Sequence, residues 1–288
     1  MKQEMRHGKQ PLMPGSFSPG CLSGKSKREE LAPLSQTLQS PLGKEMSFSL
    51  LDSRLGAVTS GKTLEKPCGD CGFAIAYPNG TVVLAAFDGV GGKPDDFFAS
   101  KFCAESARGF LLASPRASMR DALINAENGL KASAQWQAYP QGSKPGCTAC
   151  LVRISKKGVL DGAYAGDCFA VLASGKDYSA KKLTLDQRSD EGIGLSCYIG
   201  KNACMCGEVK GARLAKGDAV VVSSDGLENL LMKEIGGIAL SHSNMENAAL
   251  ELVRLSNSRR DFAEYQTTSG SRVLGKADDR LVLAYLQD

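Results

Sequence analysis

Strand-like stretches in this chain come in runs, and this order restricts the fold more than any other feature. Residues 73–77 and 81–87 are apolar stretches joined by Pro78-Asn79-Gly80, a pattern that predicts a β-hairpin. Consecutive strands joined by short turns favour antiparallel sheets over a parallel, doubly wound sheet. Further strands are expected at 147–154, 159–165, 168–174, 218–224 and 280–286, with a weaker one at 196–200.

Helical periodicity separates these runs of strands. One helix is expected after Pro94, where phenylalanines recur at helical spacing, and a second over about 116–136. Two more are expected over 227–238 and about 244–258. The sequence therefore predicts an α+β protein in which helices pack outside antiparallel sheets.

The first 46 residues differ in composition from the rest of the chain. They contain seven Lys/Arg, four Asp/Glu and five of the eleven prolines. We interpret residues 1–46 as a disordered basic tail and residues 47–288 as one folded domain. The cluster Lys25–Arg28 is expected to be solvated, with a docking or targeting role as the alternative. The near-neutral remainder argues against a nucleic-acid-binding body.

The lengths of the apolar runs and the number of cysteines bear on where in the cell the protein is expected. No apolar run reaches the ~20 residues needed to span a bilayer, and no secretory signal is recognisable. We therefore expect a cytoplasmic protein, without a membrane partner, whose ten cysteines are reduced. Cys147 and Cys150 lie three apart in a strand-like stretch, so they should point to opposite faces. Cys68 and Cys71 remain a minor redox candidate.

Histidine is too scarce to carry the chemistry of most hydrolases. The chain has only His7 and His242, so a Ser-His-Asp site would depend on His242 alone, and a His-rich zinc site is excluded. Carboxylates are the better candidates for a functional site.

Several aspartates lie at the edges of strongly apolar stretches. Carboxylates brought together there would repel one another, and their burial without partners would be costly. A divalent cation with oxygen ligands, Mg²⁺ or Mn²⁺, would resolve both problems. The residues are Asp88, Asp167, Asp225, Asp278 and Asp279.

The alternative interpretation is that these are ordinary Asp-Gly turns, as we expect for Asp161-Gly162. After Asp88-Gly89 and Asp225-Gly226, however, the chain is expected to enter helices, so neither dipeptide closes a hairpin.

Six short motifs occur in one order along the chain: FDGVGG at 87–92, GCTA at 146–149, AGDC at 165–168, LTLD at 183–186, SDGL at 224–227 and DDRLV at 278–282. In this order they resemble the FDGHGG, GSTA, GDSR, LTxD, SDGL and DNxTV motifs of the metal-dependent protein phosphatases (the PPM family, or type 2C). The resemblance covers about residues 50–288. It implies a four-layer α-β-β-α sandwich of two antiparallel sheets flanked by helix pairs.

The resemblance also implies an activity and the residues that carry it. A monomeric enzyme would hydrolyse phosphoserine or phosphothreonine in phosphoprotein substrates, by attack of a water that bridges two Mg²⁺ or Mn²⁺ ions. Asp88 would bridge the ions. The Gly89 carbonyl and Asp70 would complete one site, and Asp225 and Asp278 the other. Asp167 would match a third, weaker site.

Four positions depart from the family pattern. Val90 replaces a histidine proposed as general acid, Gly69 replaces a glutamate beside Asp70, and Asn229 replaces an acid after Asp225. The phosphate-binding arginine falls at Glu65 or Lys66, and Lys66 is our candidate for that role. Two alternatives stay open: a catalytically weak regulatory protein with this fold, and a phosphatase for a small phosphorylated metabolite.

Overall fold

The computed structural model describes most of the chain beyond residue 31. The described residues are 32–40, 44–62, 66–185, 187, 195–201, 206–259, 264–266, 272–274 and 278–288. Contacts divide the chain into Met1–Leu31 and Ala32–Asp288, and the first unit, with the Lys25–Arg28 cluster, lies outside the described residues.

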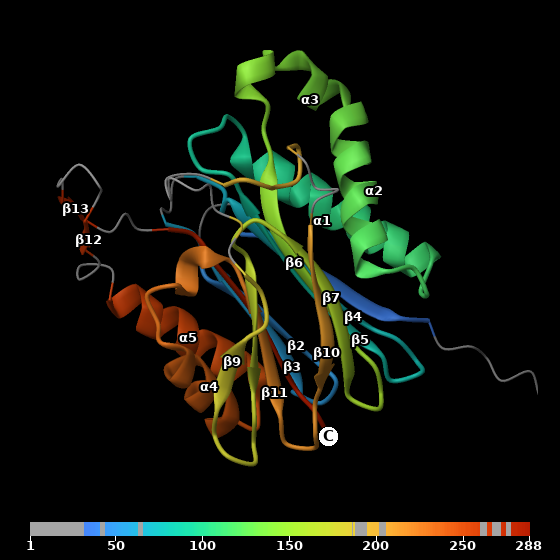
Figure 1. Cartoon of the computed structure of the whole chain (residues 1–288), viewed down its shortest axis with the longest axis vertical. Helices are drawn as coiled ribbons and strands as arrows, with labels where there is room; N and C mark the ends of the chain where they lie inside the picture. Colours follow the sequence, from blue (N-terminus) through green and yellow to red (C-terminus); the bar gives the residue numbers. More distant parts are fainter. Residues whose placement is uncertain are drawn as a thin grey trace, which may run out of the picture. The chain divides into compact units, whose positions relative to one another are not determined.

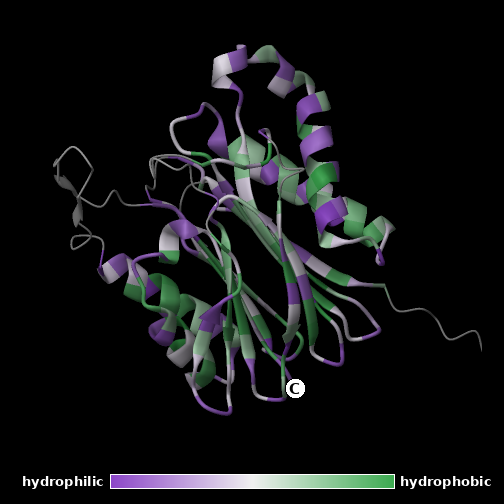
Figure 2. Cartoon of the chain, viewed as in Figure 1, coloured by the Kyte–Doolittle hydropathy of each residue, from purple (hydrophilic) through white to green (hydrophobic). Residues whose placement is uncertain are grey.

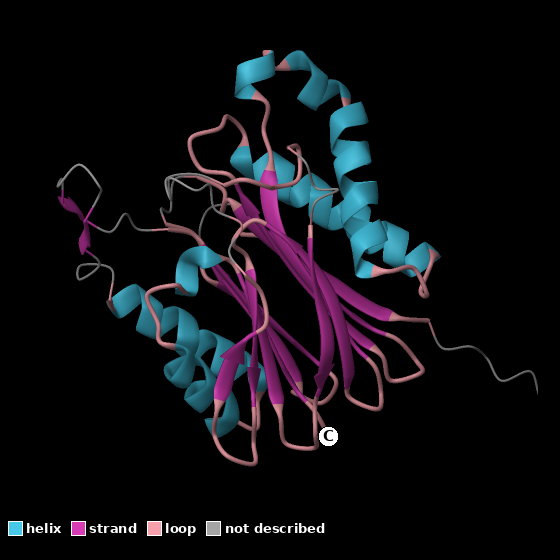
Figure 3. Ribbon diagram, viewed as in Figure 1, coloured by secondary structure: helices cyan, strands magenta, loops and turns pink. Residues whose placement is uncertain are grey.

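Two six-stranded sheets form the centre of the unit Ala32–Asp288, and all their neighbouring strands are antiparallel (Figure 3). The first sheet has the order β1 (Leu34–Leu38), β4 (Asp70–Ala76), β5 (Val82–Gly89), β6 (Cys147–Ile154), β7 (Val159–Ala165) and β10 (Gly207–Arg213). The second has the order β2 (Met46–Leu50), β3 (Leu55–Ser60), β14 (Arg280–Leu286), β11 (Ala219–Ser223), β8 (Phe169–Ala173) and β9 (Ala180–Lys182). A separate hairpin pairs β12 (Glu264–Gln266) with β13 (Arg272–Leu274).

A pair of longer helices covers the outer face of each sheet (Figure 1). Helices α1 (Asp96–Ala113) and α2 (Met119–Ala132) pack on the first sheet, and the short α3 (Ala134–Ala138) leads towards β6. Helices α4 (Met232–Ser241) and α5 (Met245–Ser258) pack on the second sheet. The expected four-layer α-β-β-α sandwich is therefore confirmed.

The side chains of β5 show how one sheet serves two cores. Val83 and Phe87 belong to the core beneath α1 and α2, whereas Leu84 and Ala86 belong to the core between the sheets. Because both faces of the central strands are buried, they are hydrophobic along their length, while α2 carries alternating hydrophilic and hydrophobic stripes (Figure 2). Cys147 and Cys150 lie in different cores, as their spacing predicts.

The hairpin at 73–87 has the predicted turn. The Gly80 amide donates to the Tyr77 carbonyl at 2.9 Å, and the Thr81 amide donates to the Asn79 side chain at 2.9 Å. Gly80 adopts a φ of 81°, a conformation that favours glycine.

Other elements differ from the expectations. Leu34–Leu38 lies in the expected tail but pairs with β4 as an edge strand of the first sheet, and its buried Leu38 joins the core between the sheets. Strands β9 and β10 lie where no strand was expected, whereas the weak strand expected at 196–200 forms only isolated bridges. Asp161-Gly162 lies within β7 rather than in a turn. The helix expected from residue 227 starts at Met232, after a short 3₁₀ helix at Asp225–Leu227.

Among the described residues, no helix combines the length and apolar character required to cross a bilayer.

Candidate metal centre

Asp88 lies at the end of β5, on the face that points towards the second sheet. It continues the line of Leu84 and Ala86, which pack between the sheets. The strand register places Asp70 of β4 and Thr148 of β6 directly opposite it. Because cross-strand neighbours share a face, Asp70 and Asp88 project together at the end of the inter-sheet core.

Three carboxylates form a tight cluster at this place. One oxygen each of Asp88, Asp167 and Asp225 lies within 4.8 Å of the others. Asp167 lies in the turn between β7 and β8, and Asp225 follows β11, so both sheets contribute. The structure thus brings together three residues that are far apart in sequence, as the sequence predicts.

Burial and mutual repulsion make the charged forms of these acids unfavourable without a cation. Burial, followed by the charges of Asp70 and Asp225, raises the pKa of Asp88 well above its ordinary value. Burial and the charges of Asp278 and Asp167 do the same to the pKa of Asp225. Burial and Asp279 raise the pKa of Asp70 to about 8, against the opposing effect of a hydrogen bond from Ser224.

Two carboxylate oxygens of the site are buried without a hydrogen-bond partner. The Ser224 hydroxyl donates to Oδ2 of Asp70 at 2.6 Å, but Oδ1 of Asp70 has no partner, and neither has Oδ1 of Asp225. Buried polar atoms are rarely left unpaired. These oxygens and the cluster form an all-oxygen donor set, which fits Mg²⁺ or Mn²⁺.

Gly89 allows the chain to pass close to the first turn of α1. A Cβ atom at Gly89 would lie 2.5 Å from the backbone carbonyl of Asp96, too close for any side chain. The Gly89 amide donates to the Gly69 carbonyl at 3.1 Å, and the Val90 amide donates to the Gly146 carbonyl at 3.0 Å. These bonds fix the backbone immediately after Asp88, where the Gly89 carbonyl was expected to serve as a ligand.

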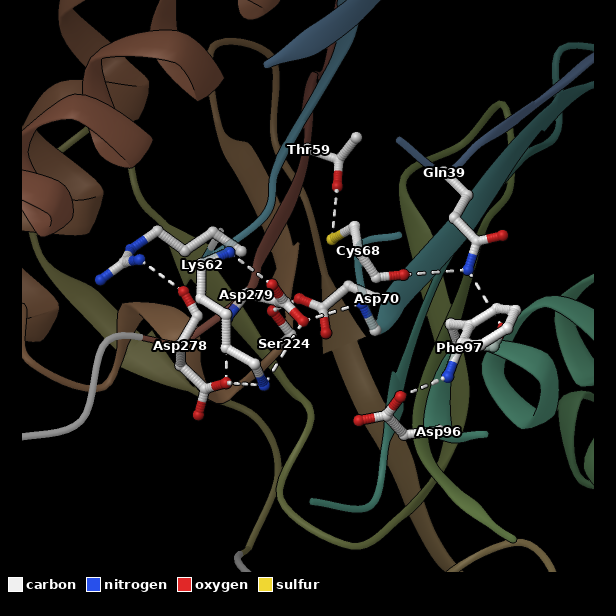
Figure 4. Close-up of polar contacts among 12 residues, drawn as sticks. Gln39, Thr59, Lys62, Cys68, Asp70, Asp96, Phe97, Ser224, Asp278 and Asp279 are labelled. Carbon is white, nitrogen blue, oxygen red and sulfur yellow. Dashed lines mark hydrogen bonds and ion pairs between the residues drawn. The ribbon is translucent and has the colours of Figure 1, made fainter. Parts of the chain in front are cut away.

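Asp278 lies on a second side of the centre, where a lysine pairs with it (Figure 4). The Lys62 ammonium lies 3.7 Å from Oδ1 of Asp278 and 3.6 Å from Oδ2 of Asp279. The buried Asp279 also accepts hydrogen bonds from the amides of Lys62 at 2.5 Å and Gly69 at 2.7 Å. Burial lowers the pKa of Lys62, but the neighbouring carboxylates outweigh this effect and raise it.

A buried network joins the loops that carry Asp225 and Asp278. The Ser256 hydroxyl donates to the Gly226 carbonyl at 2.7 Å. The Arg280 side chain donates to the Ser256 hydroxyl at 2.7 Å and to the Asp278 carbonyl at 2.6 Å. The second sheet and α5 therefore hold both aspartates in a fixed relation.

Comparison with solved structures identifies the fold, although no family model and no curated protein matches the sequence. Serine/threonine phosphatase Stp1 from Staphylococcus aureus matches with a TM-score of 0.65 at 14% identity, over 85% of this chain and 99% of Stp1. The PPM Ser-Thr phosphatase MsPP from Mycobacterium smegmatis, in complex with cacodylate, matches with a TM-score of 0.54 at 17% identity, over 90% and 99%. The chain has the fold of the PPM phosphatases. RsbX in complex with magnesium matches with a TM-score of 0.56 at 16% identity, over 84% of this chain and 100% of RsbX.

Within this PPM fold, the expected residues fall into three groups. Asp88, Asp167 and Asp225 form the cluster. Asp70 lies beside Asp88, and Asp278 lies near enough to raise the pKa of both Asp88 and Asp225. Lys66 is exposed, and no hydrogen bond or ion pair joins it to any residue in the described part of the chain. Its phosphate-binding role stays a prediction, and Asp186 lies outside the described residues.

The sequence assigned no role to Lys62 or Ser224, which lie near the centre, whereas Asp279 was one of the five candidate aspartates. Lys62 carries no motif signal that separates it from other lysines, and Ser224 was noted only as the first residue of the SDGL motif. The structure gives Asp279 a definite place: a Cβ atom at Gly69 would lie 2.8 Å from Oδ2 of Asp279. The Asp279 carboxylate thus occupies space that is free because residue 69 has no side chain.

Two further expectations concern side chains at the edge of the centre. Asn229, which replaces an acid, donates to the Ser256 carbonyl at 3.0 Å and so supports the same network as Arg280. Cys68 and Cys71 are buried free thiols, and burial raises the pKa of both. Because the thiolate is the reactive form, their environment disfavours redox chemistry.

Proposed function

We propose that this chain is a Mg²⁺- or Mn²⁺-dependent phosphatase that hydrolyses phosphoserine and phosphothreonine in proteins. The observation that carries the proposal is the cluster of Asp88, Asp167 and Asp225, at the edge of which two buried carboxylate oxygens lack a partner. The fold, shared with serine/threonine phosphatases, supports the reaction class. A cytoplasmic location and a monomeric state remain predictions.

The residues of the chain would divide the work between holding ions and fixing the site. Asp88, Asp225 and Asp278, with Asp70 and the Gly89 carbonyl, would hold two ions, and Asp167 a third. When bound, such ions lower the pKa of a bridging water and stabilise the charge on the phosphoryl oxygens.

Other groups would position these ligands and complete proton transfer. Ser224 orients Asp70, and Arg280 fixes the backbone at Asp278. Val90 is apolar and supplies no proton, so the leaving alkoxide would take its proton from water.

The decisive experiment measures phosphate release by the full chain. Mn²⁺-dependent turnover of phosphoserine peptides and of an aryl phosphate would be compared for the natural protein, Asp88→Asn and Asp225→Asn. Asp52→Asn is the matched control, because Asp52 is exposed in the turn between β2 and β3 and adopts a φ of 53°, which asparagine tolerates.

Each outcome selects one function. Metal-dependent turnover that is lost in both site variants and kept in Asp52→Asn supports the proposal. Preference for the aryl phosphate over every peptide would favour a phosphatase for small metabolites. Phosphopeptide binding without turnover, at any Mn²⁺ concentration, would favour a regulatory protein with this fold.

A further inference from the structure

A basic cavity of about 550 Å³ lies beside the loop that follows Asp88. Among the residues that the structure describes, none that lines it is acidic. An indole and a phenol contribute part of the wall, so the cavity combines positive charge with aromatic surface. The principal lining residues are Lys93, Lys131, Trp136, Lys144, Tyr198 and Lys201.

Contacts to the backbone hold two of these lysines in place without neutralising them. The Lys144 ammonium donates to the carbonyls of Trp136 and Gln137 at 3.0 Å each and lies 4.4 Å from the centre of the Trp136 ring. The Lys93 ammonium donates to the Gly142 carbonyl at 3.0 Å. Of the cavity's lysines, only Lys131 forms an ion pair in the described part of the chain, with Glu127 at 3.0 Å.

Lys93 and Lys144, which backbone carbonyls hold and which form no ion pair in the described part of the chain, provide a preorganised site for an anion. Lys93, Lys144 and Lys201 leave a surplus of positive charge in one concave place. An anion bound there would gain charge-assisted hydrogen bonds, and little of the lysines' conformational entropy would be lost on binding.

The backbone connects this cavity directly to the metal centre. Lys93 follows Asp88 by five residues, and the Val90 amide donates to the Gly146 carbonyl between the two sites. Cys147, opposite Gly89 on β6, also pairs with Ile199, which lies next to Tyr198 of the cavity. The loop that follows Asp88 and the start of β6 therefore link the metal centre to the wall of the cavity.

We propose that this cavity binds a second anionic side chain of the phosphoprotein substrate. The protein would then prefer phosphoserine or phosphothreonine sites with a second phosphorylated or acidic residue nearby. The inference rests on the proposed function for its substrate class, but the binding itself needs neither turnover nor a metal ion.

Trp136 provides a direct readout, because it is the only tryptophan of the chain and lies in the cavity. The metal-free full chain would be titrated with three peptides of one sequence that carry phosphoserine, glutamate or alanine at a single position. We expect a saturable change in Trp136 emission with the phosphoserine peptide, a weaker response with glutamate and none with alanine. No saturable response to phosphoserine would overturn the proposal.

The double variant Lys93→Met/Lys201→Met tests which residues bind the anion, and it leaves the Lys144–Trp136 contact intact. We expect its affinity for the phosphoserine peptide to be about tenfold weaker. Lys181→Met, an exposed lysine on β9, is the matched control and should bind as the natural protein does. Equal affinity in the double variant and the control would contradict the assignment.

Kinetics then connect binding with specificity. If the chain turns over phosphopeptides, kcat/KM for a doubly phosphorylated peptide should exceed that for the singly phosphorylated peptide, and the double variant should reduce this ratio about tenfold. An unchanged ratio would show that the cavity does not select substrates. If turnover is absent altogether, the proposed function fails, and the fluorescence titration still decides whether the cavity binds anions.

Discussion

The two sides of the acidic centre satisfy their carboxylates in different ways. Asp88, Asp167 and Asp225 lie together, with one carboxylate oxygen of each within 4.8 Å of the others. Asp278 and Asp279, on the other side, share the ammonium of Lys62 at 3.7 and 3.6 Å. On the first side, burial and the neighbouring carboxylates raise the pKa of Asp88 and Asp225, whereas on the second side a lysine pairs with two carboxylates.

This difference has a physical consequence for metal binding. Repulsion among the three clustered carboxylates favours an ion there, because the ion replaces an unfavourable interaction with a favourable one. At Asp278, an ion must compete with Lys62 for the same carboxylate. We therefore expect the cluster to bind the first ion, and Lys62 to weaken binding of a further ion at Asp278.

Asp88→Asn should produce the largest effect, because Asp88 belongs to the cluster and is the expected bridging ligand. Mn²⁺-dependent phosphate release should fall by about 10³-fold, as when a group that stabilises the transition state is removed. The metal-free variant should also be more stable by about 1 kcal/mol, since one repelling charge is gone. Parallel activity and urea-unfolding measurements would check both, and a destabilised apoprotein would contradict the repulsion argument.

Mn²⁺ itself should stabilise the folded protein, because unfolding separates the clustered ligands. At a concentration 100 times the Kd, binding contributes about 2.7 kcal/mol. For a unit of this size the expected rise in Tm is about 5–10 °C. Thermal scans with and without Mn²⁺ test this, and an equal rise in Asp88→Asn would place the ion elsewhere.

The metal-free protein should lose stability as pH rises. The pKa of Asp70 is about 8 in the folded state against 3.8 ordinarily, so the folded state holds a proton that the unfolded state releases. Stability is then highest near pH 4, falls by up to ~1.4 kcal/mol per pH unit for one such group, and levels off above pH 8. Urea unfolding in EDTA from pH 5 to 9 would show this slope, and Asp70→Asn should flatten it. A free energy of unfolding that rises with pH would contradict this prediction.

The cluster side of the centre was predictable from the sequence, because Asp88 and Asp225 follow strong local patterns. Asp88 ends an apolar run of β5, and Asp225 follows another in β11, so each acid lies where a buried strand must end. The resemblance of the ordered motifs to those of the PPM family then predicted that Asp88 and Asp225 belong to one metal site. The hairpin that presents Asp88 depended on Asn79-Gly80, a local turn signal.

Asp278 and Asp279 were candidates from the sequence, but their pairing with Lys62 and Gly69 could not be predicted, because these contacts join distant segments. Asp279 accepts hydrogen bonds from Gly69, 210 positions away in the sequence, and from Lys62, 217 positions away, and no local pattern predicts such a pairing.

Strands β9 and β10 were missed for a different reason. They are edge strands with several exposed polar residues, so the alternation that marks a half-buried strand is weak.

Lys62→Met should give the smallest effect and the sharpest test of the difference between the two sides. Removing the ammonium leaves Asp278 and Asp279 unneutralised, so a metal ion no longer competes with a built-in charge. Affinity for the weaker-binding Mn²⁺ should rise about fivefold, or ~1 kcal/mol, while the metal-free protein loses stability because the buried Asp279 is left without its cation. Lys66→Met is the matched control, since Lys66 is exposed and forms no ion pair in the described part of the chain. Calorimetric Mn²⁺ titrations would measure this affinity. Unchanged or weaker affinity in Lys62→Met would mean that Lys62 does not compete with the ion, and the two sides of the centre would then not differ in metal binding.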